Sequence, residues 1–163
     1  MQNKETFSRF GKDFQEKLCH LMLKDRPFCD QITEVLNLEF LDYEHLRVFV
    51  DIMLKYRERY KIHPSYSIME TRIRCEVNNY SKALKEKLIN FYKVIMATHD
   101  LPQEKYIKES SIEFCRKQVL KSAMMKSVRL IKTSSFDEIQ GVIESALKLG
   151  TDNNFGHDYI KDF

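Results

Sequence analysis

Chemically reactive side chains are few in this sequence, and their spacing limits what they could do. The four cysteines form no CxxC pair and have no histidine at zinc-finger spacing, so no structural zinc site is expected. Cys19 is followed directly by His20, but side chains of consecutive helical residues point about 100° apart. Reduced, buried cysteines are therefore a better interpretation than a thiol nucleophile or a metal site.

The sequence also lacks the motifs of nucleotide binding and hydrolysis. A P-loop needs a glycine-rich turn that holds phosphates, followed by Lys and then Ser or Thr. Gly11-Lys12 is followed by Asp13, and Thr6 stands where the first glycine of the loop would be. The five histidines form no HExxH motif, and no GxSxG motif occurs. We therefore expect these residues to carry neither catalysis nor a bound cofactor.

Two stretches contain residue types that nucleic-acid-binding proteins use. The net charge of +3 is too small to indicate such a partner by itself, but the segment 101–135 is rich in Lys and Arg. The candidate phosphate-binding residues are Arg116, Lys117, Lys121, Lys126 and Arg129. The run 56–61 mixes tyrosine with arginine and lysine. A solvated helix surface explains the first stretch, and core packing of Tyr56 and Tyr60 explains the second.

Hydrophobic periodicity defines the elements that must position these residues. Apolar side chains recur at helical spacing over 7–22, 28–36, 42–60, 67–77, 84–95, 103–132 and 136–149. Ser67-x-x-Glu70 and Ser135-x-x-Glu138 have the pattern of capping boxes, and Asp42 is expected to be an N-cap. No segment alternates with period two, and four glycines are few for an all-β fold. The sequence therefore predicts an all-α protein.

The helices over 84–96 and 104–131 are joined by a short connection containing Pro102, which predicts a long antiparallel hairpin. Gly150 is suited to end the last helix. The second arm of this hairpin carries an apolar stripe too wide for contact with a single neighbour. Its members are Phe114, Val119, Leu120, Ala123, Met124, Val128 and Ile131. The helix that follows has its own apolar face, formed by Phe136, Ile139, Ile143 and Leu147.

Length and hydropathy indicate the setting. A chain of 163 residues can bury the core of one domain. No apolar run approaches the roughly 18 residues that span a membrane. The polar residues 1–6 do not resemble a secretory signal, so a cytoplasmic location is expected.

The order of elements resembles the N-terminal domain of DnaB-type replicative helicases over essentially the whole chain. The similar features are the hydrophobic run within 16–23, the His45-x-x-Val48-Phe49 element and the segment 62–65 around Pro64. The tail 155–163 is most similar to the phage branch, in which a comparable segment leads into the ATPase domain. The loop after Ile62 departs from the family because it lacks the glycine common before this proline.

The resemblance implies a collar domain over 1–132, with a globular part at 1–79 and the hairpin at 80–132. A linker helix at 133–150 and a tail at 151–163, leading toward an ATPase domain, would follow. Copies would associate as dimers, trimers or hexamers through the stripe from Phe114 to Ile131. The 136–149 face would dock on a neighbouring subunit's motor domain, and we expect it to be left without a partner in this chain.

Further implications of the resemblance concern partners and catalysis. Primase or a helicase loader would bind the collar, and contact with DNA would be weak or indirect. ATP and Mg would belong to the motor domain, so these residues would support DNA replication without catalysing a step themselves.

Two other interpretations stay open. The chain could be a stand-alone helical adaptor or helicase loader that binds single-stranded DNA through the basic helix over 103–132. Affinity that falls steeply with salt would favour that adaptor, whereas weak DNA binding with clear self-association would favour the collar. An enzyme using Cys19 and His20 would require a depressed thiol pKa and an accessible pocket.

Overall fold

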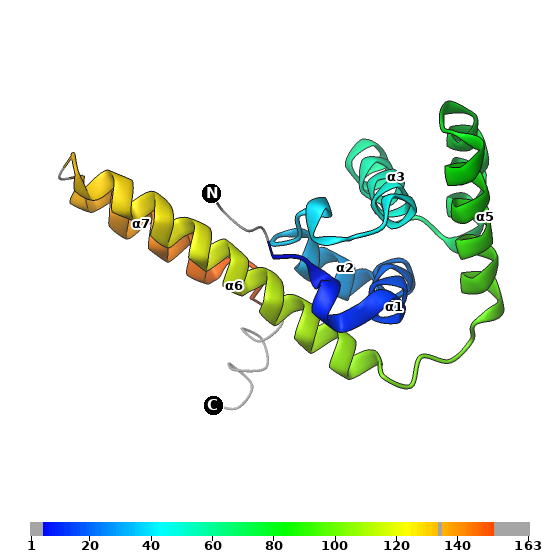
Figure 1. Cartoon of the computed structure of the whole chain (residues 1–163), viewed down its shortest axis with the longest axis horizontal. Coiled ribbons are helices and arrows are strands. Elements are labelled where there is room, and N and C mark those ends of the chain that lie inside the picture. Colours follow the sequence, from blue (N-terminus) through cyan, green and yellow to red (C-terminus); the bar gives the residue numbers. More distant parts are fainter. Residues whose placement is uncertain (1–4, 134, 152–163) are drawn as a thin grey trace. The chain divides into compact units, whose positions relative to one another are not determined.

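The computed structural model of the chain describes residues 5–133 and 135–151, and all regular structure in these ranges is helical (Figure 1). The prediction of an all-α fold is confirmed. In chain order the elements are η1 (Phe7–Phe10), α1 (Gly11–Lys24), α2 (Arg26–Thr33), η2 (Leu38–Phe40), α3 (Glu44–Tyr60), α4 (Tyr66–Glu76), η3 (Val77–Asn79), α5 (Lys82–Ala97), α6 (Glu104–Ile131) and α7 (Phe136–Lys148).

The chain divides into two compact units. The globular unit comprises Met1–Cys29 and Asn37–Lys108, and the hairpin unit comprises Asp30–Leu36 and Glu109–Phe163. Helices α2 and α6 each contribute residues to both units. The division differs from the predicted boundary at 79/80, because α5 belongs with the globular unit.

The globular unit has a core of large side chains. Helices α1, α3 and α5 are amphipathic, and their apolar faces meet there. The core residues with almost no exposed surface include Phe7, Leu18, Leu21, Met22, Leu46, Phe49, Met53, Met69 and Leu88. The ring of Phe49 meets that of Phe91 edge-on, with centroids 5.0 Å apart. Each such side chain stabilises the fold by about 1.5–3 kcal/mol through burial.

Polar residues set the ends of these helices, and three predicted caps are wrong in detail. The Oγ atom of Ser65, rather than Ser67, accepts the N–H of Ile68 at 3.1 Å and caps α4. Tyr43 is the N-cap of α3, while Asp42 accepts hydrogen bonds from the side chains of Ser8 and Gln15. Ser135 does precede α7, but its side chain makes no capping hydrogen bond.

Helix α5 packs mainly on α3 and α4, so it is not the first arm of the expected hairpin. One hydrogen bond fixes this contact: the Tyr92 hydroxyl donates to the Tyr66 carbonyl at 2.7 Å. A 3.6-residue pattern shows which face of a helix is buried but not which helix covers it, and the sequence-based pairing of α5 with α6 depended on adjacency alone.

The antiparallel pair in the hairpin unit is α6 with α7. Helix α7 folds back along α6 after a tight turn, in which the Ser135 N–H donates to the Leu130 carbonyl (Figure 1). Small residues are buried in this unit, namely Ala123, Ser127 and Ala146. Helix α7, expected to be a separate linker helix, is therefore one arm of the hairpin.

Candidate functional site

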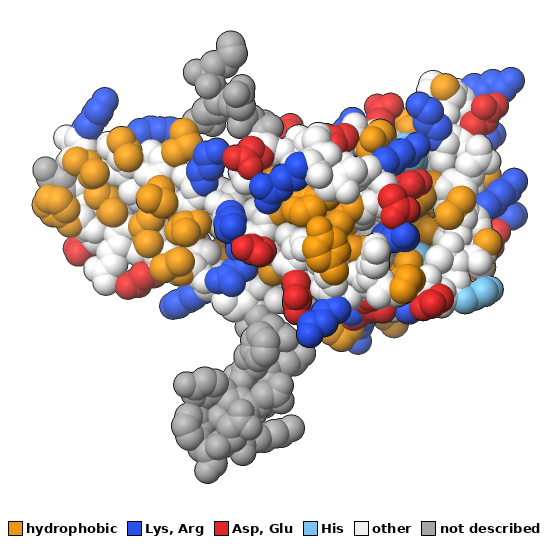
Figure 2. Space-filling view, turned by 60° about the horizontal axis from the view of Figure 1, so that its bottom comes forward, with side chains coloured by type: hydrophobic (Ala, Val, Ile, Leu, Met, Phe, Trp, Pro, Cys, Tyr) orange, Lys and Arg blue, Asp and Glu red, His pale blue; other side chains and the backbone are white. Residues whose placement is uncertain are grey.

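The α6–α7 hairpin exposes large apolar side chains, most of them near its turn. We define the hairpin surface as Met124, Val128, Ile131, Phe136 and Leu147, all of which are exposed. Val128 keeps 62% of its surface accessible and Phe136 keeps 70%. Figure 2 shows hydrophobic side chains gathered over this part of the molecule, at the left of the view. In proteins generally, exposed apolar clusters are frequent at contacts with other molecules.

The predicted stripe on α6 divides into buried and exposed members. Phe114 and Ala123 are buried within the chain, so they are unavailable to a partner, which corrects their assignment as interface residues. Val119 and Leu120 are half-buried. Only Met124, Val128 and Ile131 present large exposed side chains. The stripe is wide because one part of it packs inside the molecule and another part does not.

The apolar face of α7 is divided in the same way. Ile139 and Ile143 are half-buried, because α7 lies along α6 instead of standing alone. Phe136 and Leu147, at the two ends of the helix, are exposed. The apolar face of α7 was expected to be uncovered. It is uncovered at the two ends of the helix, whereas its middle is half-buried.

The basic residues of α6 do not form one free patch. The Arg116 guanidinium donates from Nη2 to the Leu147 carbonyl at 3.0 Å and from Nε to the Leu149 carbonyl at 3.2 Å. It therefore caps the C-terminal end of α7, where the helix dipole favours a cation. Lys117 pairs with Glu113 on its own helix at 3.1 Å.

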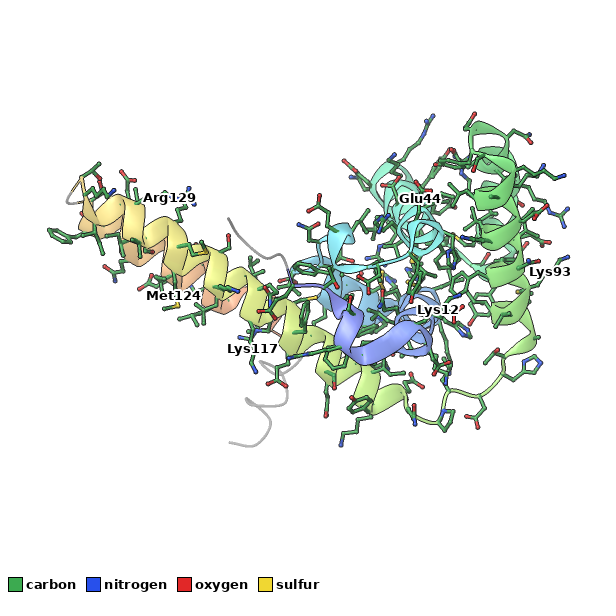
Figure 3. The ribbon with its side chains drawn as sticks, viewed as in Figure 1. Lys12, Glu44, Lys93, Lys117, Met124 and Arg129 are labelled. Atoms are coloured by element: carbon green, nitrogen blue, oxygen red, sulfur yellow. The ribbon has the colours of Figure 1, made fainter. Side chains whose placement is uncertain are left out.

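The remaining candidates for phosphate contact, Lys121, Lys126 and Arg129, are exposed. Figure 3 shows Arg129 and Met124 projecting from different sides of the hairpin. Lys121, by contrast, lies three residues before Met124 and seven before Val128, so it shares their face of α6.

Gly150 closes the end of the hairpin opposite to its turn. Its N–H donates to Glu34 Oε1 at 3.2 Å, and its carbonyl accepts from Gln31 Nε2 at 2.9 Å. Its φ of 73° lies in the left-handed region, as expected for a glycine that ends a helix. A Cβ atom here would stand 2.9 Å from the Arg116 Cγ and the Val35 Cγ1 atoms, so only glycine fits without a shift. We call this set of contacts the Gly150 clasp.

The Cys19–His20 pair is part of the core of the globular unit. Burial, and to a smaller extent the charge of Glu16, raises the pKa of the fully buried Cys19 thiol, the opposite of what a nucleophile requires. Burial also lowers the pKa of His20, whose Nε2 lies 3.0 Å from the Tyr66 hydroxyl. This geometry gives no support to catalysis by the pair.

Sequence reasoning misplaced one aromatic residue. Tyr60 was expected in the core, yet 53% of its surface is exposed, because it lies in the last turn of α3. It lines a groove in the globular unit together with Tyr56 and Tyr80.

Within the described residues no helix is long and apolar enough to cross a bilayer, and no cluster of His, Cys, Asp or Glu could hold a metal ion. Comparison of the chain with models of protein families, with curated proteins and with solved structures finds no match.

Proposed function

We propose that this chain is the N-terminal assembly domain of a DnaB-type hexameric replicative helicase. In this role the hairpin surface joins one copy to another, and the collar so formed docks primase or a helicase loader. The observation that carries the proposal is the exposure of five large apolar side chains on one helical hairpin. ATP-driven unwinding would belong to a motor domain and not to these residues.

The energetics of the hairpin support this role. Residues packed inside the hairpin unit include small ones such as Ala123, Ser127 and Ala146, whereas Val128, Ile131 and Phe136 remain in water. Covering apolar surface gains about 25 cal/mol per Å², so the side chains left outside gain most from a second molecule. Helical pairs with such a face commonly assemble into larger bundles.

The resemblance in element order supports the same proposal. An opening helix and the His45-x-x-Val48-Phe49 element on α3 occur in the order typical of the helicase collar. The hairpin comes later in the chain than expected, at α6–α7. The proposal therefore assigns the contact between copies to Met124, Val128, Ile131, Phe136 and Leu147.

Sedimentation equilibrium of the purified chain tests this proposal. The wild-type chain is expected to self-associate, and Val128→Glu is expected to shift it to monomer by placing a charge in the apolar contact. Arg129→Glu is the matched control, because it adds the same side chain at the next position, and it should leave the association constant nearly unchanged.

Two results would refute self-association through the hairpin: a wild-type chain that stays monomeric at the highest soluble concentration, or two variants that weaken association equally. Circular dichroism on both variants separates loss of assembly from loss of fold.

The second candidate function is an adaptor that binds single-stranded DNA through α6. The exposed side chains of Lys126 and Arg129 favour it. Its support is narrower, because Arg116 caps α7 and Lys117 pairs with Glu113. Lys126→Ala combined with Arg129→Ala should weaken DNA binding if the adaptor is correct, with the salt slope falling by about 0.7 for each phosphate that is no longer neutralised.

A further inference from the structure

Three tyrosines line a groove on the globular unit. Tyr56 and Tyr60 come from α3, and Tyr80 lies just before α5. The rings of Tyr56 and Tyr60 have centroids 4.8 Å apart and are tilted by 41°, so they form an adjacent pair without full stacking. Since Tyr60 is more exposed than buried, its ring offers an aromatic surface to solvent. Core packing therefore does not account for the ring of Tyr60 in this groove.

The lining of the groove contains three cations and two carboxylates. The Arg59 guanidinium stands over the Tyr60 ring, with its central carbon 5.5 Å from the ring centroid, so a base would stack on Tyr60 beside this cation. Lys55 pairs with Asp51 at 2.9 Å, and Arg72 pairs with Glu76 at 3.0 Å, so these two cations are largely neutralised.

A second hollow of the globular unit, which we call the lysine continuation, shares Tyr80 with the groove. The continuation adds Lys82, Lys85 and Lys93 against one carboxylate, that of Glu86. Among the described residues, no ion pair engages these three lysines. Figure 3 shows Lys93 directed outward from α5. Tyr80 therefore lies between a hollow lined by aromatic rings and a hollow lined by available cations.

We propose that this surface, the tyrosine groove with its lysine continuation, binds single-stranded nucleic acid. A base stacks on Tyr60, a neighbouring base reaches Tyr56 or Tyr80, and the phosphates lie along Arg59 and the three lysines. Stacking on aromatic side chains with phosphate contacts alongside is the general chemistry of sequence-tolerant single-strand binding. A duplex is a poorer ligand, because its base faces are already stacked.

This inference is independent of the proposed function. The groove lies wholly in the globular unit and uses no residue of the hairpin surface. It is also distinct from the adaptor candidate, which places the nucleic acid on α6. A chain could self-associate without binding a single strand here, or bind one without self-associating.

Fluorescence anisotropy with a labelled oligothymidylate of about 16 nucleotides, the upper site size of one binding groove, tests the inference. Tyr60→Ala is expected to weaken binding at least about fivefold, since one stacked base contributes about 1–3 kcal/mol. Tyr60→Phe should restore affinity to within about twofold of wild type, because the stacking face is retained. Lys85→Ala with Lys93→Ala should lower the salt slope by about 1.4.

The control is Lys126→Ala with Arg129→Ala on α6, which should leave affinity unchanged within about twofold if the groove is the binding site. A matched oligouridylate and a duplex of the same length complete the set; equal binding of DNA and RNA supports stacking on the tyrosines. Because the sequence contains no tryptophan, quenching of tyrosine emission gives a second readout of the same event.

Four results would overturn the inference: no salt-sensitive binding of the single strand, equal affinity for the duplex, equal losses in Tyr60→Phe and Tyr60→Ala, or loss confined to the α6 variant. Tyr60 is exposed, so its variants should fold, which circular dichroism verifies.

Discussion

The two units of this chain use their hydrophobic residues in different ways. The globular unit buries phenylalanine, leucine and methionine completely, as Phe49, Leu46 and Met53 show. The hairpin unit buries Phe114 together with small residues such as Ala123 and Ala146, while it leaves Val128 and Phe136 in water. Both units leave some large apolar side chains exposed, Ile62 and Val94 in the globular unit among them, but the most exposed one that the structure describes, Phe136, lies on the hairpin.

This difference separates residues that hold the fold from residues that can serve a partner. Removing a buried side chain lowers the free energy of unfolding, so substitutions in the core of the globular unit should act on stability. Exposed apolar side chains contribute little to the stability of a single molecule, so substitutions in the hairpin surface should act on association. The contrast gives an ordered series of expected effects.

The largest effect is expected in the core of the globular unit. Phe49→Ala removes a fully buried ring and should lower the free energy of unfolding by about 3–5 kcal/mol. Val128→Ala, in the hairpin surface, should change it by less than about 0.5 kcal/mol. Urea denaturation measures the free energy of unfolding of each variant. Equal losses in the two variants would contradict the difference between the buried core and the hairpin surface.

The next effect concerns the Gly150 clasp. Gly150→Ala should destabilise the hairpin unit by about 1–3 kcal/mol, because φ is positive and the new Cβ meets Arg116 and Val35. Gly141→Ala is the matched control within α7: its Cβ meets nothing within 4 Å, so it should stabilise the helix by about 0.5–1 kcal/mol. Hydrogen exchange of the α7 amides reports both, and unchanged protection in Gly150→Ala would contradict the role assigned to the clasp.

A smaller effect concerns pH and the globular unit alone. Burial, together with the charge of Lys24, lowers the pKa of His20 in the folded chain, while Glu104 opposes the shift. The unfolded state then binds the proton more readily, so stability is complete above the unfolded pKa and is lost as pH falls below it. The urea concentration at the midpoint of unfolding should therefore be lower at about pH 5.5 than at about pH 7.

His20→Gln should reduce that fall, because it removes one of the titrating groups. His45, whose pKa is also lowered by burial, accounts for part of the remainder. Urea midpoints at the two pH values give the comparison, and a slope identical to wild type would show that His20 does not contribute.

The smallest effect is expected at an exposed ion pair on α6. Lys117 and Glu113 are each about two-thirds exposed, so Lys117→Ala should change stability by less than about 0.5 kcal/mol. Thermal melts at low and high salt check this. A loss as large as that of Gly150→Ala would mean that the charged face of the hairpin carries more structure than its exposure indicates.

Most helices could be predicted from the sequence, because hydrophobic spacing and the break at His63-Pro64 are local signals. The pairing of helices could not be predicted, because α5 and α6 are adjacent in sequence and both have suitable apolar faces. The Ser65 cap was missed because Ser67 offers the same side chain two residues later, with the acidic partner of a capping box.

The site was harder to predict than the fold. A stripe on α6 does not distinguish Phe114, which is buried in the chain, from Val128, which is not. Tyr60 fits the apolar periodicity of α3 but falls in its last turn, where the side chain stays exposed. The signal that could have identified it was its position at the end of the helix, beside Arg59 and before the break at Pro64.

The Gly150 clasp has a mechanical consequence. Helix α7 is joined to α6 by the chain turn at one end and by Arg116 at the other, where Gln31 and Glu34 also hold Gly150. A pull applied to the backbone at Thr151 would reach these contacts first, and they would bear it together. Helix α7 would then stay on α6 until the hydrogen bonds of the clasp break. Under a weaker pull the force would pass to residues 31–34 and to α6, and the two helices of the hairpin would remain together.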